Sequence, residues 1–335
     1  MVINASFYMN LALREAWKYQ GLTYPNPAVG CSIVGSSGEL LAVEAHQKAG
    51  FAHAEVLALQ TAYAKLTNEP TILNLTLSSE IHTFLLKNHH NIFHGTSLFT
   101  TLEPCAHQGK TPSCASLIAQ LGIKKVYVGS PDLTKEAACG NEKLLACGIE
   151  VESDVLKEKC DALLKPFSMW KEKQFVFFKW AQRLNGTTDA GIISSKKSRE
   201  NVHAMRDVCD LLVIGGNTVR EDRPTLDARL MNGKAPDVLI LSRGKIFDKT
   251  IPLFNVANRK VIISDDFTPC KDYKNIMIEG SSQMFELSRD IVDYYLCYQA
   301  PLLGGKSGFE IEEDKLKILN LLQVDEDIIM WMKRI

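Results

Sequence analysis

The chain has 335 residues, which is long for a single hydrophobic core, so we expect two domains. Its formal net charge of −1 at pH 7 offers no basic surface to nucleic acid or an anionic membrane. A small molecule is therefore the expected partner. The sequence does not decide whether the chain forms a homo-oligomer.

Nowhere do about 18 uncharged apolar residues follow one another, so we expect no membrane span and a cytoplasmic location. Nine scattered cysteines are typical of thiols or metal ligands, not of a disulfide framework.

Strand-like and helical patterns alternate along the first part of the chain. The periodicity predicts helices at 10–19, 54–66 and 114–122. Short apolar runs predict strands at 28–35, 96–102 and 124–130. This alternation is typical of an α/β domain in which a sheet lies between two layers of helices.

One stretch of this first part, residues 65–95, has a poor pattern, and we interpret it as an insertion. It contains four histidines, namely His82, His89, His90 and His94. Because they are spaced irregularly in a polar connector, a solvated loop or an extra helix is favoured over a metal site.

A strand at 148–153 and an amphipathic helix at 154–170 precede a new apolar strand at 174–181. We place the domain boundary near residue 150, which gives domains 1–149 and 150–335. In the second domain the pattern predicts helices at 199–209 and 282–290. Its strands are predicted at 210–216, 236–242, 259–264, 274–280 and 293–305. The second domain is therefore also α/β.

A candidate metal site lies in the first domain. His53 and Glu55 open a predicted helix, Cys105 follows a strand, and Cys114 opens the next helix. One imidazole and two thiolates leave the fourth position of a zinc ion to water, as in a catalytic site. Zinc lowers the pKa of that water, and Glu55 can carry the proton to a leaving group, as in the zinc deaminases. The alternative is a chance HxE with two cysteines buried in the core.

The cysteine spacing narrows the class of enzyme. Eight residues separate Cys105 from Cys114, whereas cytidine and tRNA-adenosine deaminases have PCxxC. The segment EPCAHQGKTPSC resembles EPCSHxG(R/K)TPPC of the bifunctional riboflavin-biosynthesis deaminase/reductase family. Upstream, YPNPAVGCSIV and AHQKAGFAHAEVLAL resemble that family's PNPxVGCVIV and GxHxxAGxPHAEVxAL.

The resemblance implies a cytidine-deaminase-like α/β/α domain that deaminates ring carbon 2 of a diaminopyrimidinone carrying ribosylamino 5-phosphate. It places one Zn²⁺ on His53, Cys105 and Cys114, with Glu55 as the catalytic proton shuttle. It places three substrate contacts at Asn26, His46 and Lys110. For Asn26 the alternative is a turn residue, and for Lys110 it is a solvated lysine.

Two stretches of the first domain depart from the family pattern. The interval from His53 to Cys105 is enlarged by the insertion, and SPDLTKEAACGNE replaces DPNPxVxGxG. Neither departure changes a residue of the expected zinc site.

The second domain has no GxGxxG, so a Rossmann fold is not supported. Gly215 and Gly216 after a buried strand fit a phosphate-binding turn or simply a tight turn. The stretch MRDVCDLLVIGGNTVREDRPTLDAR resembles LRxxxDAIlvGxxTVxxDxPxLxxR of the same family's reductase domain, which is similar in fold to dihydrofolate reductase and uses NADPH. This implies substrate contacts at Arg206, Leu226 and Arg229 and nucleotide contacts at Thr218 and Asp222. Surface ion pairs are the alternative for the arginines.

Other segments resemble the reductase pattern less closely. FKWAQRLNG resembles KxAxSLDG, with Arg183 and Asn185 in place of serine and aspartate, and the SxW pair that should follow is missing. IMIEGSSQMFEL resembles (V/I)EGGxxLxxxL, with Ser281 in place of the second glycine, and DYYLCYQAPLLGG resembles VDExxxyxAPxxxG. The resemblance implies a substrate contact at Glu279. It implies cofactor contacts at Gln182, Ser242, Gly280, Ser281, Ser282 and Gln283.

We therefore expect a zinc-dependent pyrimidine deaminase fused to an NADPH-dependent reductase. The two would perform consecutive steps of riboflavin synthesis, and the product would be 5-amino-6-(5-phosphoribitylamino)uracil. One alternative is a deaminase whose C-terminal domain has lost reductase activity, which the missing SxW pair favours. Another is a binding module with a structural zinc, against which Glu55 argues because a structural site has no use for a proton carrier.

Overall fold

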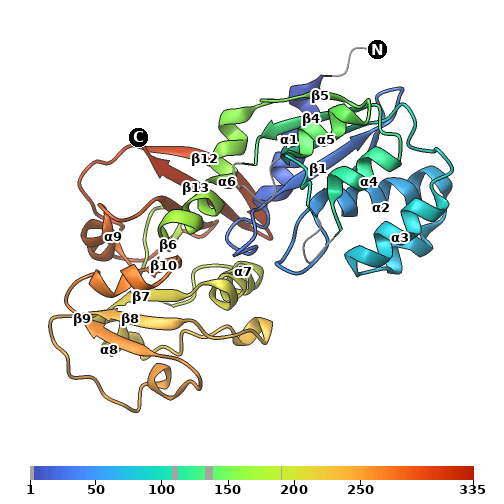
Figure 1. Cartoon of the computed structure of the whole chain (residues 1–335). Helices are drawn as coiled ribbons and strands as arrows, with labels where there is room; N and C mark the ends of the chain where they lie inside the picture. Colours follow the sequence, from blue (N-terminus) through green and yellow to red (C-terminus); the bar gives the residue numbers. More distant parts are fainter. Residues whose placement is uncertain (1–3, 108–111, 133–138, 190) are drawn as a thin grey trace. The chain divides into compact units, whose positions relative to one another are not determined.

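The computed structural model describes residues 4–107, 112–132, 139–189 and 191–335. The chain divides into two compact units, Met1–Phe167 and Ser168–Ile335 (Figure 1). This division falls within helix α6 (Lys157–Glu172). The functional boundary expected between residues 149 and 150 stays a prediction.

The first unit contains a five-stranded sheet whose inner strands are buried. The strands have the order β2-β1-β3-β4-β5, with bounds Leu40–Ala45, Gly30–Val34, Ser97–Leu102, Lys125–Ser130 and Glu150–Glu152. Strand β1 is antiparallel to both neighbours, whereas β3, β4 and β5 are parallel. Every residue of β1 and β3 is buried, as expected of strands covered by helices on both sides.

Two glycines set how closely one layer of helices approaches the sheet. A Cβ at Gly30 would lie 1.9 Å from the carbonyl oxygen of Ala12 in α1 (Ala5–Trp17), and a Cβ at Gly129 would lie 2.3 Å from Sγ of Cys160 in α6. The opposite face is covered by α2 (Ala54–Thr67) and α4 (Cys114–Gln120) (Figure 1). The expected α/β/α arrangement is confirmed.

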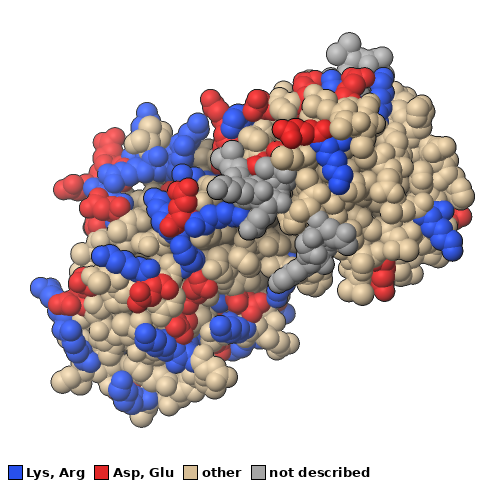
Figure 2. Space-filling view, viewed as in Figure 1, with Lys and Arg blue, Asp and Glu red and all other residues tan. Residues whose placement is uncertain are grey.

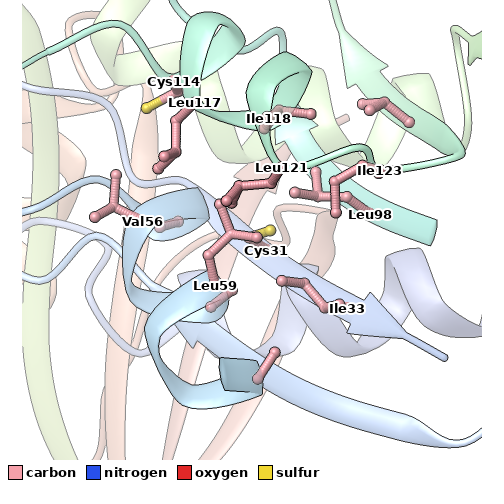
Figure 3. Packing of buried hydrophobic residues seen from close by; sticks show 14 of the residues in the cluster. Cys31, Ile33, Val56, Leu59, Leu98, Cys114, Leu117, Ile118, Leu121 and Ile123 are labelled. Carbon is pink, nitrogen blue, oxygen red and sulfur yellow. The ribbon is translucent and has the colours of Figure 1, made fainter. Parts of the chain in front are cut away.

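The core between α2, α4 and the sheet is fully apolar. Leu59 of α2, Ile118 of α4 and Leu121 just after it are completely buried, together with Cys31 and Ile33 of β1. Figure 3 shows these side chains packed in the space between the two helices and β1. This packing fixes the helix starts, where the candidate metal ligands lie.

The stretch 65–95 forms regular structure. It contains the 3₁₀ helix η1 (Pro70–Asn74) and α3 (Ser78–Asn88). The Gln60 side chain donates hydrogen bonds of 2.7 and 2.9 Å to the carbonyls of Ile72 and Leu75, so the stretch is attached to α2. Of its four histidines only His82 is buried, and none belongs to the metal-ligating group found among the described residues. Of the two structures expected for this stretch, a solvated loop or an extra helix, the extra helix is confirmed.

The second unit contains a mixed eight-stranded sheet. Its order is β12-β13-β11-β6-β10-β7-β8-β9, with bounds Leu316–Val324, Asp327–Arg334, Tyr294–Ala300, Phe175–Arg183, Asn275–Glu279, Leu211–Gly215, Asp237–Leu241 and Val261–Ser264. The six strands from β11 to β9 are parallel, and β13 and β12 are antiparallel additions at one edge. Strand β10 therefore lies between β6 and β7, although it comes late in the chain.

Three helices belong to this sheet, with bounds Lys196–Val208 for α7, Gly216–Asp222 for α8 and Ser282–Ser288 for α9. The expected turn at Gly215 and Gly216 is in fact the junction where β7 passes directly into α8. A Cβ at Gly216 would lie 2.6 Å from the Ser242 side chain, so only glycine fits there without a shift.

Sequence patterns did not predict several elements. These are β2, α5 (Gly140–Ala146), α8, β12 and β13. In β12 no residue is fully buried, so its sequence lacks the alternation that marks a half-buried strand.

Charges of both signs lie side by side on the visible face of the second unit, in agreement with the near-zero net charge (Figure 2). Within the described ranges, no helix combines the length and apolarity needed to span a membrane.

Removing a core side chain should destabilise the first unit measurably. For Leu59→Ala we expect a loss of about 3–5 kcal/mol in the free energy of unfolding, because the site is closed on all sides and a cavity remains. Urea denaturation followed by circular dichroism measures this. The matched variant Leu73→Ala, at a side chain that is 49% exposed, should change the value by about 0.5 kcal/mol or less. Equal losses in both variants would contradict the packing described.

Candidate active sites

Three side chains of the first unit form a group that can hold a metal ion. His53 is the N-cap of α2, Cys114 is the first residue of α4, and Cys105 lies between β3 and α4. Their ligand atoms all lie within 4.8 Å of one another, and Nδ1 of His53 is 3.3 Å from Sγ of Cys114 and 3.8 Å from Sγ of Cys105. One nitrogen and two sulfurs suit zinc and leave one tetrahedral position open.

The two cysteines are held together by the start of α4. Ser113 caps this helix by accepting a hydrogen bond from the Ser116 amide, and its hydroxyl donates to the Cys105 carbonyl at 2.9 Å. The amide of Cys114 donates to Sγ of Cys105 at 3.3 Å, and the Ala115 amide donates to the Cys105 carbonyl at 3.1 Å. Cys105 and Cys114 therefore lie close together, although eight residues separate them in the sequence.

The hydrogen bonds of this pair favour metal binding. A hydrogen bond between the two cysteine side chains, followed by the bond with His53, lowers the pKa of Cys105 despite its burial. The same bond and complete burial raise the pKa of Cys114. Cys105 is thus a ready thiolate, and metal binding displaces the remaining proton from Cys114.

Glu55 lies two residues beyond His53, in the first turn of α2, and is only 4% exposed. Burial raises the pKa of this carboxyl to about 7. A group with such a pKa can take up a proton and release it again near neutral pH.

Asn26 and His46 are joined beside the metal group. Nδ2 of Asn26 is 3.1 Å from Nε2 of His46, and Nδ1 of His46 is 3.0 Å from the Ala52 carbonyl. Burial lowers the pKa of His46 to about 4, so the ring is neutral, its Nδ1–H donates to Ala52 and its Nε2 accepts from Asn26. The His46 ring meets the His53 ring edge to face, with centroids 5.7 Å apart. Lys110 lies outside the described residues.

The second unit contains a buried cluster of charges. Arg206 of α7 binds Glu279, the last residue of β10, through three hydrogen bonds of 2.8–3.0 Å. Lys179 lies beside Glu279 in the parallel register of β6 and β10, with Nζ 3.7 Å from the carboxylate. Burial alone would raise the pKa of Glu279, but the charges of Arg206 and Lys179 outweigh it and lower the pKa.

Sequence reasoning missed Lys179. A signal was present, because a lysine within the apolar run FVFFKWA is expected to be buried and lysines are rarely buried without a partner. Burial lowers the pKa of this amine, and Nζ also lies 5.7 Å from the centroid of the Tyr298 ring.

Leu226 and Arg229 lie apart from the bond between Arg206 and Glu279. Leu226 is buried with a left-handed φ of 55°, and Arg229 begins η2 (Arg229–Met231) with an exposed side chain that binds Asp227 at 2.6 Å. The Asp227 carbonyl is 3.4 Å from Nη1 of Arg206, so Asp227 links the two arginines.

The expected cofactor contacts follow neighbouring strands. Gln182 is near the end of β6, where its side chain accepts a 2.7 Å hydrogen bond from Trp180. Ser242 follows β8. Gly280 and Ser281 join β10 to α9, and Ser282 and Gln283 are the first two residues of α9. Thr218 is in α8 after β7, and Asp222 is the exposed last residue of that helix. The carboxyl ends of parallel strands lie at one edge, where open α/β sheets bind ligands.

The segment without the SxW pair is fixed by its own contacts. Nη1 of Arg183 donates to the Asp189 carbonyl at 2.6 Å, and Nδ2 of Asn185 donates to the Gly304 carbonyl at 2.9 Å. The Asp189 carboxylate accepts from the Lys306 amide. The two residues that depart from the family pattern therefore stabilise this loop.

Comparisons with known proteins match each of the two units to a known domain. The family model of the cytidine and deoxycytidylate deaminase zinc-binding region matches residues 3–130, and that of the RibD C-terminal domain matches residues 174–272. A riboflavin biosynthesis protein RibD of Actinobacillus pleuropneumoniae is 28% identical over 379 aligned positions, which cover 96% of this chain and 93% of that protein. The chain belongs to the RibD family.

Another RibD, that of Aquifex aeolicus, is 35% identical over 242 residues, covering 70% of this chain and 60% of that protein. A solved Thermotoga maritima structure, a diaminohydroxyphosphoribosylaminopyrimidine deaminase/5-amino-6-(5-phosphoribosylamino)uracil reductase, has a TM-score of 0.65 at 28% identity and covers 99% of both chains. Acinetobacter baumannii RibD has a TM-score of 0.62 at 26% identity, with the same coverage. The resemblance inferred from the motifs and the expected pair of α/β domains are thus confirmed.

The metal group can be tested by metal content. We expect Cys114→Ser to lower zinc retained after dialysis against a chelator from about one per chain to less than a tenth, because a ligand sulfur is lost. Mass spectrometry of the metal measures this. Cys147→Ser, which changes an exposed cysteine of the same unit, should retain its zinc. Equal zinc in both variants would exclude this site.

Proposed function

We propose that this chain performs two consecutive steps of riboflavin biosynthesis. The first is hydrolytic deamination of 2,5-diamino-6-ribosylamino-4(3H)-pyrimidinone 5′-phosphate, and the second is NADPH-dependent reduction of the ribosyl side chain. The proposal rests chiefly on the His53, Cys105 and Cys114 group with a buried Glu55 beside it. Membership of the RibD family supports joining this chemistry to a reductase.

In the deaminase site, His53, Cys105 and Cys114 would hold a zinc ion, which would supply an activated water at the position left open. Glu55 accepts the proton of the attacking water and delivers it to the amine at ring carbon 2. The carbon–nitrogen bond breaks, ammonia leaves and the carbon keeps the oxygen as a carbonyl, while the second proton of the water goes to the adjacent ring nitrogen. Asn26, oriented by neutral His46, hydrogen-bonds the pyrimidinone, and Lys110 attracts its phosphate.

In the reductase site, bound NADPH would supply a hydride to C1 of the open-chain imine, and the imine nitrogen would take a proton from solvent, which leaves a ribityl chain. Glu279 contacts the substrate and is held by Arg206, while Leu226 and Arg229 line the substrate site beyond Asp227. Gln182, Thr218, Asp222, Ser242 and the segment 280–283 contact the nucleotide. Catalysis is mainly the positioning of two reactants.

We further propose a cytoplasmic enzyme whose partner is this small pyrimidine phosphate and not a nucleic acid or a membrane. The nine cysteines, all free thiols, suit a reducing compartment.

Glu55→Gln should separate metal binding from turnover. We expect it to keep its zinc and to lose ammonia release by about 10²-fold or more, because the amide cannot carry a proton. NADPH oxidation with previously deaminated substrate should be unchanged. Ammonia release within threefold of wild type would remove Glu55 from the proposed mechanism.

Glu279→Gln should affect only the second step. The change leaves Arg206 and Lys179 buried without their carboxylate, so NADPH oxidation with the deaminated substrate should fall by at least tenfold. Ammonia release should stay at the wild-type level. The surface variant Glu286→Gln, on α9, is the matched control and should retain both activities.

A second candidate function is deamination alone, favoured by the segment after Asn185, which lacks the family's SxW pair. Following ammonia and NADPH in one cuvette with wild-type protein distinguishes the two. NADPH consumption after ammonia release supports the bifunctional enzyme. Ammonia without NADPH consumption supports the deaminase alone.

A further inference from the structure

Helix α3 lies in a part of the chain that the family pattern does not contain. The stretch 65–95 enlarges the interval between His53 and Cys105, so membership of the RibD family assigns no role to its side chains. Of the four histidines in this stretch only His82 is buried, with 5% of its surface exposed. The insertion thus places a polar ring inside the first unit.

The helix that carries His82 is fixed against its neighbours. Ile81 and Leu85 of α3 are completely buried in the apolar core that α3 shares with α2 and α4. The Phe84 ring meets the Tyr63 ring of α2 edge to face, with centroids 5.4 Å apart. These contacts hold His82 in place before any ligand binds.

One ring nitrogen of His82 lacks a partner. Its Nε2 is closed off from solvent and forms no hydrogen bond with any residue that the structure describes. His46, another buried histidine of this unit, uses both ring nitrogens, one with Asn26 and one with the Ala52 carbonyl. Because a buried polar atom without a hydrogen bond costs free energy, Nε2 of His82 is suited to a group that a ligand brings.

His82 lies near the zinc group without belonging to it. The charges of Cys105 and His53 both act on its ring, but the ring supplies none of the ligand atoms that lie within 4.8 Å of one another. Burial lowers the pKa of His82 to about 4, so the ring is neutral near pH 7. A neutral imidazole suits a ring nitrogen, carbonyl or hydroxyl of a ligand better than a phosphate.

We propose that His82 is a substrate-contacting residue of the deaminase site and that its Nε2 hydrogen-bonds the pyrimidinone or a ribosyl hydroxyl of the substrate. This inference rests on the proposed deaminase function. Because His82 lies outside the group that carries out the chemistry, the contact is made in the bound substrate as well as in the transition state. Uniform binding of this kind lowers KM and leaves kcat unchanged.

The kinetics of ammonia release by the full-length, zinc-loaded protein test the proposal. His82→Leu fills about the same space without a polar atom, so KM for the diaminopyrimidinone phosphate should rise at least tenfold while kcat changes less than threefold. Its zinc content should equal that of wild type. Its midpoint of urea denaturation should not fall, because the variant removes a buried nitrogen that has no partner.

Two further variants and a second substrate sharpen the test. His82→Gln keeps a nitrogen near the position of Nε2 and should raise KM less than His82→Leu does. His94→Leu changes an exposed histidine of the same stretch and should leave KM and kcat at wild-type values. With a substrate that lacks the 5′-phosphate, His82→Leu should raise KM by the same factor, since the contact is made to the uncharged part.

Other outcomes would overturn the proposal in distinguishable ways. A KM within twofold of wild type in His82→Leu would mean that the ring serves packing alone. Loss of zinc in that variant would assign His82 to the metal group. Equal rises in KM for His82→Leu and His82→Gln, with lower denaturation midpoints in both, would assign it a structural role. If folded, zinc-loaded wild type released no ammonia from this substrate, the proposed deaminase function itself would fail.

Discussion

Burial of the inner strands of both sheets is the constraint on which the two sites depend. A strand covered by helices on each side mainly takes apolar side chains, so most charged and metal-binding side chains lie at strand ends and helix starts. His53, Glu55 and Cys114 accordingly lie at the first turns of α2 and α4. In the second unit, Glu279 is the last residue of β10 and Ser242 follows β8. The chemistry of each unit is concentrated along an edge of its sheet.

Lys179 departs from this arrangement because it lies within β6. Its amine is tolerated there because Glu279 is its register neighbour and Arg206 satisfies the rest of that carboxylate. The three side chains depend on one another, since removing one leaves another charge buried without a partner. Arg206 and Lys179 thus place two basic side chains on one buried carboxylate.

The zinc group and its helix starts could be predicted because local sequence contains both signals, the apolar helical pattern and the His53 and Cys105 motifs. The bond between Arg206 and Glu279 could not be predicted in this way. The two residues are 73 positions apart in the sequence, and they meet only because β10 lies beside β7 in the sheet. Strand β12 has no clear alternation, and α3 lies in a segment whose pattern was too weak to read. Most features that the sequence did not predict are therefore contacts between distant residues or elements whose side chains are only partly buried.

The position of β10 between β6 and β7 also constrains how the second unit is built during synthesis. Strands β6 and β7 stay apart until Asn275–Glu279 has been made, more than 90 residues after β6 ends. At about 5–20 residues per second this leaves β6 without that neighbour for roughly 5–20 s and β7 for roughly 3–13 s. Both edges are exposed to wrong pairing in that interval, so folding of this unit is expected to depend on chaperones more than folding of the first.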